Sequence, residues 1–176
     1  NDGTISNNKL WIGFSDKKEN KKIGYFGYFE KNDFIKIDKN FKVSNGPAID
    51  EKNKFIYFSD SASRTIFKYS LKKFKRNFFF KFSISQGYPD GIALDNKGGL
   101  WVAHWAGGKV SRINKNGKID FSINLPALNI TSVTFVGKNL DYLFVTSAKV
   151  ETSIRVKKKY VHSGSSFLLK TNFKGQ

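Results

Sequence analysis

The sequence contains no cysteine and no methionine, and it has little proline, histidine or arginine. Without cysteine there can be no disulfide framework and no thiolate zinc site. With only His104 and His162 available, a zinc site built on imidazoles is also disfavoured. No apolar run approaches the roughly 18 residues of a membrane-spanning helix, and no signal-peptide segment is recognisable. We therefore expect no membrane partner.

Methionine is missing even from the first position, because the chain opens on Asn1. We therefore expect a portion of a longer protein. The lack of cysteine leaves the redox compartment open. We expect a cytoplasmic location, with the periplasm as the alternative.

Acidic residues are few, 14 against 31 basic ones, and the net charge is +17. Such a charge is typical of proteins that bind nucleic acid. However, 27 of the basic residues are Lys and four are Arg, whereas base and phosphate recognition relies on the bidentate guanidinium group. We interpret the charge as a solvated Lys-rich surface and expect no nucleic-acid partner.

The apolar residues, 39% of the chain, come in short alternating runs that predict strands, and 16% of residues are aromatic. One pattern recurs after about 45 residues: a polar-Gly pair, a strand-like run, a Gly-containing turn and further strand-like runs. The clearest copies begin at Asn45-Gly46 and Asp90-Gly91, and weaker ones begin at Asn1-Asp2-Gly3 and Thr131-Ser132.

Four short strands in about 45 residues are typical of a β-propeller blade. The sequence therefore predicts an all-β fold in which residues 1–176 form a partial propeller domain of about four blades, the last incomplete. The N-terminal blades would be missing and the ring open. A β-sandwich is the alternative, but it would not explain the repeat.

The repeat also predicts a site, because it places Asp2, Asn45 and Asp90 at equivalent corners of successive blades, before the innermost strand. Carboxylate and amide oxygens suit a hard cation such as Ca²⁺, Mg²⁺ or Mn²⁺. Each Asx-Gly pair taken alone is more simply a turn. Their coincidence at one position is what favours metal binding.

An ordered set of motifs resembles the senescence-marker-protein, regucalcin and gluconolactonase family over nearly the whole chain. These motifs are Asn1-Asp2-Gly3, Leu10-Trp11-Ile12-Gly13, Ser44-Asn45-Gly46, Tyr57-Phe58-Ser59-Asp60-Ser61, Pro89-Asp90-Gly91, Leu100-Trp101-Val102-Ala103 and Phe144-Val145-Thr146-Ser147-Ala148. The resemblance implies a six-bladed propeller with a divalent cation in its channel, Ca²⁺ first, with Zn²⁺, Mg²⁺ or Mn²⁺ as alternatives. It also implies hydrolysis of a sugar lactone, a small-molecule substrate.

By the same resemblance, Asn45 and Asp90 are metal ligands, and Asn1 and Asp2 contact the substrate. Asp90 is in addition the candidate catalytic residue, because a carboxylate beside the cation can take a proton from the attacking water. The family's third ligand, a Glu, and an Arg before the Asn-Asp pair would precede Asn1. We therefore expect the segment alone to be inactive.

Two other functions stay open: a calcium-binding regulatory propeller of the regucalcin type without turnover, and a nucleic-acid-binding propeller. Fold and cation do not by themselves establish chemistry. A serine hydrolase is disfavoured, because no Ser lies in a recognisable nucleophile motif. The oligomeric state is not predicted.

Four more residues carry expectations. His104 follows a predicted strand and either faces the sugar or packs in the core. Asp60 and Arg64 flank a hairpin as a local surface pair. Asp95 lies at a hairpin turn, where replacement by Asn is expected to have little effect.

Overall fold

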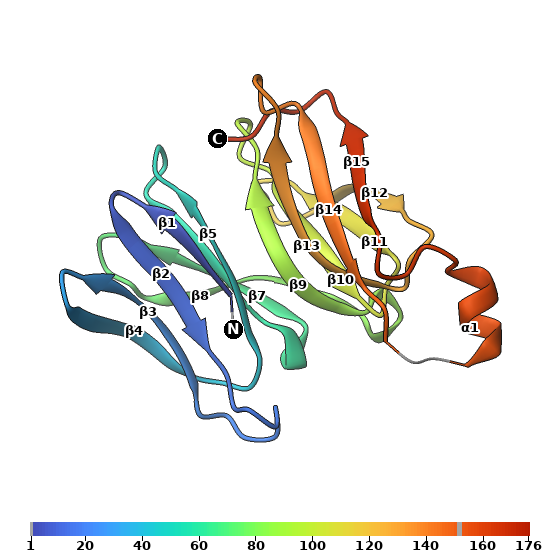
Figure 1. The fold of residues 1–176 in the computed structure, drawn as a ribbon. Coiled ribbons are helices and arrows are strands. Elements are labelled where there is room, and N and C mark those ends of the chain that lie inside the picture. The colour runs from blue at the N-terminus through green and yellow to red at the C-terminus, as the bar shows by residue number, and fades with distance from the viewer. Residues whose placement is uncertain (1, 151–152) are drawn as a thin grey trace. The chain divides into compact units, whose positions relative to one another are not determined.

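The computed structural model describes residues 2–150 and 153–176. This part of the chain is mostly β-strand, with one short helix, α1 (Ile154–Lys159). It divides into two compact units, Asn1–Phe82 and Ser83–Gln176, which are drawn in Figure 1. The predicted all-β class is confirmed. No helix in the described ranges is long and apolar enough to cross a membrane.

Each unit holds two antiparallel sheets, called blades here because each is a meander of strands consecutive in sequence (Figure 1). In the first unit, blade 1 consists of β1 (Asp2–Ser6), β2 (Lys9–Phe14), β3 (Gly24–Glu30) and β4 (Asp33–Phe41), and blade 2 of β5 (Ser44–Asp50), β6 (Phe55–Asp60), β7 (Thr65–Ser70) and β8 (Arg76–Lys81). In the second unit, blade 3 consists of β9 (Tyr88–Leu94), β10 (Leu100–Trp105), β11 (Lys109–Ile113) and β12 (Ile119–Asn124), and blade 4 of β13 (Asn129–Val136), β14 (Tyr142–Ala148) and β15 (Ser166–Lys170).

The turns of blade 3 lie where the sequence predicts them. Gly98 and Gly117 have φ angles of 76° and 74° in the turns after β9 and β11. Glycine adopts this left-handed conformation without the steric penalty that a side chain would bring. The two glycines therefore allow the chain to turn after β9 and β11.

Alternating side chains build one core in each unit. In the first unit the core is aromatic, and the rings of Phe26 and Phe58 stack with centroids 4.1 Å apart. In the second unit Trp101 of β10 packs with Ile130 and Val133 of β13 and with Leu143 of β14. Burying one such side chain contributes about 1.5–3 kcal/mol. These cores hold the two blades of each unit together.

The strand registers correct one detail of the repeat. Tyr57 lies opposite Lys68, and Trp101 lies opposite Arg112, so Tyr57 and Trp101 hold the same place in blades 2 and 3. The 45-residue offset of the repeat, from Asn45 to Asp90, aligns Ile56 with Trp101 instead. The alignment is wrong by one residue, because Asp50 pairs with Phe55 across the turn of blade 2, whereas the N–H of Asp95 already donates to the carbonyl of Gly99 in blade 3.

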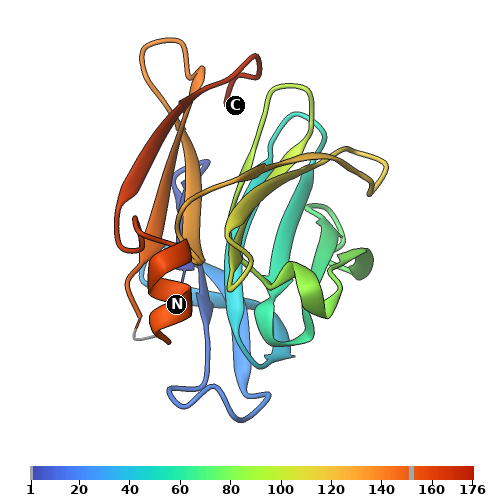
Figure 2. The ribbon, with the colours of Figure 1, turned by 90° about the vertical axis from the view of Figure 1, so that its right-hand side faces the viewer.

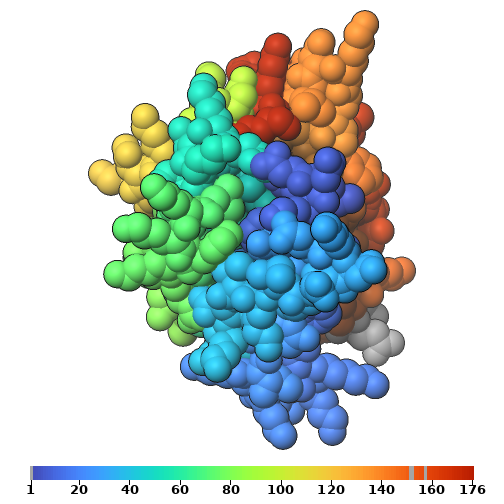
Figure 3. Space-filling view, turned by 90° about the vertical axis from the view of Figure 1, so that its left-hand side faces the viewer, coloured from blue at the N-terminus to red at the C-terminus, as the bar shows by residue number. Residues whose placement is uncertain are grey.

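Two segments lie outside the blade pattern. The β2–β3 loop, residues 15–23, projects from one end of blade 1 and is visible in the space-filling view of the first unit (Figure 3). The segment between β14 and β15 carries α1 (Figure 2). Ile154 of this helix is 75% exposed, so α1 is a peripheral addition to blade 4.

Candidate functional site

Asn45 and Asp90 hold matching positions in consecutive blades. Ser44 lies opposite Asp60, and Pro89 lies opposite His104. Asp60 and His104 each stand three residues beyond the matching pair Tyr57 and Trp101. The residues that follow Ser44 and Pro89 therefore correspond, at the start of the first strand of each blade.

The side chain of Asn45 is fixed inside the first unit. It is only 6% exposed, and its amide Nδ2 donates to the Oγ of Ser61 at 2.7 Å. Ser59 Oγ donates to the backbone carbonyl of Asn45 at 3.2 Å. Since Ser61 takes the nitrogen end of the amide, Oδ1 is the end suited to a hard cation.

Asp2 lies beside Asn45. Its Oδ2 accepts a hydrogen bond from the backbone N–H of Gly46 at 3.0 Å, and its Oδ1 accepts one from Gly3 at 2.8 Å. The first unit thus brings Asp2 and Asn45 together. Asn1, the other expected substrate contact, lies outside the described residues.

The start of the projecting 15–23 loop is hydrogen-bonded to Ser44, next to Asn45. Ser15 Oγ accepts from the backbone N–H of Ser44 at 2.8 Å, and Ser44 Oγ donates to the carbonyl of Phe14 at 2.9 Å. The 15–23 loop therefore starts beside the residue that precedes Asn45 and forms part of the surroundings of Asn45.

Asp90 belongs to the second unit, where it is half-buried in β9. The next residue, Gly91, touches blade 4: a Cβ at this position would lie 2.5 Å from Ser132 Oγ and 2.8 Å from Ser132 Cα. Only glycine permits this approach of β13 to β9.

His104 is fully buried in β10, and its Nδ1 lies 2.7 Å from the carbonyl oxygen of Gln86. A carbonyl can only accept, so Nδ1 carries the hydrogen and donates. Burial lowers the pKa of His104 to about 4, an effect increased by the charge of Lys109 and opposed by the bond to Gln86. The ring is therefore neutral near pH 7, and the packing interpretation of His104 holds.

The expectation that Asp60 is a surface residue is wrong. Its side chain is buried, and Oδ1 accepts hydrogen bonds from the backbone N–H groups of Lys42 and Val43, at 3.3 Å and 3.1 Å. The carboxylate therefore binds the chain segment that enters β5.

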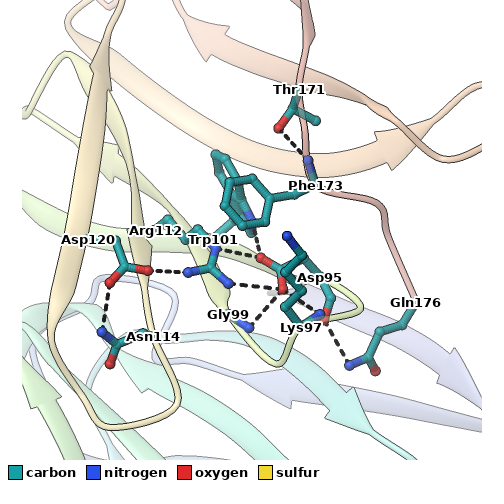
Figure 4. A network of polar contacts seen from close by, with 10 residues as sticks. All are labelled: Asp95, Lys97, Gly99, Trp101, Arg112, Asn114, Asp120, Thr171, Phe173 and Gln176. Atoms are coloured by element: carbon teal, nitrogen blue, oxygen red, sulfur yellow. Dashed lines mark hydrogen bonds and ion pairs between the residues drawn. The ribbon is translucent and has the colours of Figure 1, made fainter.

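The expectation that Asp95 is a simple turn residue is also wrong. Asp95 is 0% exposed, and Oδ2 accepts from Arg112 Nε at 2.6 Å and from Trp101 Nε1 at 2.8 Å (Figure 4). Oδ1 accepts from the backbone N–H of Gly99. Phe173 lies over the Arg112 guanidinium, 4.2 Å from its centre. This buried ion pair ties the turn, the core and the C-terminal segment together.

Among the described residues, no three or more His, Cys, Asp or Glu side chains are grouped so that they could hold one metal ion. Asn is outside that set, and the expected ligands Asn45 and Asp90 both offer oxygen. The imidazole of His104 already binds Gln86 through Nδ1. The donors that remain suit a hard cation better than zinc.

Comparison with known proteins identifies the family. Residues 1–149 match the model of the SMP-30/Gluconolactonase/LRE-like region. The chain belongs to this family. The resemblance inferred from the ordered motifs is confirmed.

Members of this family share both sequence and fold with the chain. A protein of Sulfolobus acidocaldarius is 34% identical over 84% of the chain and 57% of its own length. A 6-deoxy-6-sulfogluconolactonase of Pseudomonas putida is 32% identical over 76% of the chain and 47% of its own length. The chain thus spans about half the length of the curated relatives it matches.

The crystal structure of regucalcin from Agrobacterium tumefaciens, described as a calcium-binding protein, superposes with a TM-score of 0.87. It is 23% identical, and the match covers 96% of this chain and 59% of that protein. The expected fold is thereby confirmed: the four sheets are blades of an incomplete β-propeller.

Proposed function

We propose that the protein containing this chain hydrolyses a sugar lactone with the help of one divalent cation held by Asn45 and Asp90. The observation that carries the proposal is the matching placement of these two oxygen-bearing side chains at the start of consecutive blades. Family membership supports the reaction, since relatives include a sulfogluconolactonase.

The donor set fits a hard cation, Ca²⁺ first. The nitrogen of the Asn45 amide donates to Ser61, the oxygen of this amide is the atom type that suits a hard cation, and Asp90 supplies a charge. When bound, such a cation supplies Lewis acidity toward the lactone carbonyl. The likeness to the Agrobacterium tumefaciens regucalcin, a calcium-binding protein, supports this choice of ion.

Residues of the chain itself would carry out proton transfer and substrate binding. Asp90 accepts the proton of the attacking water, as a positioned carboxylate can. Asp2, beside Asn45, accepts a hydrogen bond from a sugar hydroxyl as it does from Gly46. Asn1 is proposed as a second contact to the sugar. The substrate is thus an aldonolactone whose hydroxyl groups face the end of blade 1.

The second candidate is a calcium-binding propeller without turnover. The same ligands would serve it, and the likeness to regucalcin favours it. Measured turnover separates the two, because only the enzyme releases aldonate from lactone.

Chelation tests the proposal. Excess EDTA should abolish lactone hydrolysis by the full-length protein, and added Ca²⁺ or Mn²⁺ should restore it, because the carbonyl needs the cation. The measurement is acid release followed in a pH-stat. Full activity in excess chelator would contradict the cation-dependent reaction, and calcium binding without acid release would favour the regulatory alternative.

A further inference from the structure

We propose that Asp60 and His104 are positioning residues that hold the segments leading to Asn45 and Asp90, and thereby set the affinity for the cation. The inference rests on the proposed function, because it concerns the residues proposed as ligands. Asp60 and His104 hold the same place in blades 2 and 3, three residues beyond Tyr57 and Trp101.

In blade 2, Asp60 is the hydrogen-bond acceptor that holds the segment before Asn45. Its buried carboxylate binds the backbone N–H groups of Lys42 and Val43, three and two residues before Asn45. The neighbouring Ser61 adds two hydrogen bonds. Its N–H donates to the Val43 carbonyl at 2.8 Å, and its Oγ accepts from the Asn45 amide. Backbone and side chain are thus fixed together.

In blade 3, His104 is the hydrogen-bond donor that holds the segment before Asp90. Its Nδ1–H binds the carbonyl of Gln86, four residues before Asp90. The segment is packed so closely that a Cβ on Gly87 would lie 2.4 Å from the carbonyl oxygen of the residue after His104, and one on Gly107 would lie 2.5 Å from the Gln86 carbonyl oxygen. The entry to β9 has little room to move.

The two contacts have opposite polarity, but each holds the segment that leads to a proposed ligand. A carboxylate accepts from N–H groups in blade 2, and an imidazole donates to a carbonyl in blade 3. Simple core filling would favour an apolar residue, because burying a polar side chain costs free energy unless it is hydrogen-bonded. In blade 1 the matching residue is the apolar Phe14. Asp60 and His104 are thus polar where blade 1 has an apolar residue.

Partners that orient a metal ligand typically change metal affinity about 10–100-fold when they are lost. We therefore test Asp60→Leu and His104→Leu, which remove the hydrogen bonds, against Asp60→Asn and His104→Asn. Asn keeps an oxygen acceptor at the first position and places an amide donor near Nδ1 at the second. Phe14→Leu is the matched control.

The experiment is calorimetric titration of the full-length apo-protein with Ca²⁺ at pH 7.5, with lactone hydrolysis at low and saturating Ca²⁺ measured in parallel. The Leu variants should raise the Kd about tenfold or more and recover most of kcat at saturating Ca²⁺. The two Asn variants and the Phe14 control should stay within about threefold of wild type. Because Ca²⁺ bound to the folded state would also rescue a partly unfolded variant, circular dichroism must show that the apo-variants are folded at pH 7.5.

Unchanged Kd in both Leu variants would overturn the inference. If the Leu variants fail to fold, Ser61→Ala and His104→Gln are measured in their place. Ser61→Ala deletes a single oxygen, and His104→Gln moves the donor away from the Nδ1 position. Wild-type Kd in both of these would overturn the inference as well.

Asn45→Ala and Asp90→Ala separate this inference from the proposed function. Wild-type Ca²⁺ affinity in these two variants would refute the proposed ligands themselves. Weakened binding in them, together with unchanged binding in the Asp60 and His104 variants, would refute only the positioning role.

Discussion

At the scale of single residues, Asp90 and Asp95 are two carboxylates of one blade in different surroundings. Asp95 is buried and bound by Arg112, Trp101 and backbone N–H groups. Asp90 is half-buried at the strand's beginning. Removing one partner of a buried ion pair leaves an uncompensated charge and typically costs about 3–5 kcal/mol.

The two substitutions Asp90→Asn and Asp95→Asn should therefore have separate effects. In the full-length protein, Asp90→Asn should lower kcat for lactone at least about a hundredfold, because it removes a proton acceptor and weakens the binding of the cation, while stability changes little. Asp95→Asn should lower the free energy of unfolding by about 3 kcal/mol, because Arg112 loses its buried partner. Lactone assays and urea titrations measure both.

The control for this pair is Asp33→Asn, at an exposed position at the start of β4. It should stay within about 0.5 kcal/mol of wild type and keep full activity. Comparable lactone hydrolysis by wild type and Asp90→Asn would contradict the proposed catalytic role of Asp90.

His104 makes the second unit sensitive to acid. Its pKa is about 4 in the folded chain and about 6.5 when unfolded, so the unfolded state binds more protons between these values. Stability should fall as the pH drops from about 6.5 to 4, by about 3 kcal/mol in total. Urea unfolding at several pH values measures this loss. In His104→Asn, which cannot titrate there, an equally steep loss would contradict this origin.

At the scale of elements, strands and Gly turns follow from alternation and turn chemistry, so the blade pattern is readable from the sequence alone. The matching of Asn45 with Asp90 is also predictable, because the two residues are separated by one repeat, although the structure places them inside β5 and β9 and not before these strands. The roles of Asp60 and Asp95 are not. Their partners Val43 and Arg112 lie 17 residues away in sequence, and only the strand register shows which groups meet.

The contact between β9 and β13 depends on Gly91. Gly91→Ala should destabilise the chain by about 1–3 kcal/mol, because the new Cβ would overlap Ser132 and force β13 outward. Thermal unfolding followed by circular dichroism measures the change. Adding Ser132→Gly removes two of the three nearest atoms and should recover part of the loss. A wild-type melting temperature for Gly91→Ala would contradict the close packing.

At the scale of the whole molecule, an apolar face of blade 4 is exposed. Phe144 of β14 lies opposite Leu168 of β15, and these side chains are 38% and 61% exposed. Exposed apolar patches on sheets favour association with other chains. The 176-residue chain expressed alone should therefore self-associate at micromolar concentration, as measured by size-exclusion chromatography with light scattering. Phe144→Thr with Leu168→Lys should reduce association, and a wild-type monomer would contradict the prediction.

The placement of the tryptophans gives each unit its own optical probe. Trp11 lies in the core of the first unit at 5% exposure, and Trp101 lies in that of the second at 0%. With the partly exposed Trp105 changed to Phe, indole emission comes from these two buried rings, whose spectrum shifts to the red on contact with water. Variants that keep a single indole therefore reveal, by their separate fluorescence transitions, whether the units lose structure together or one after the other.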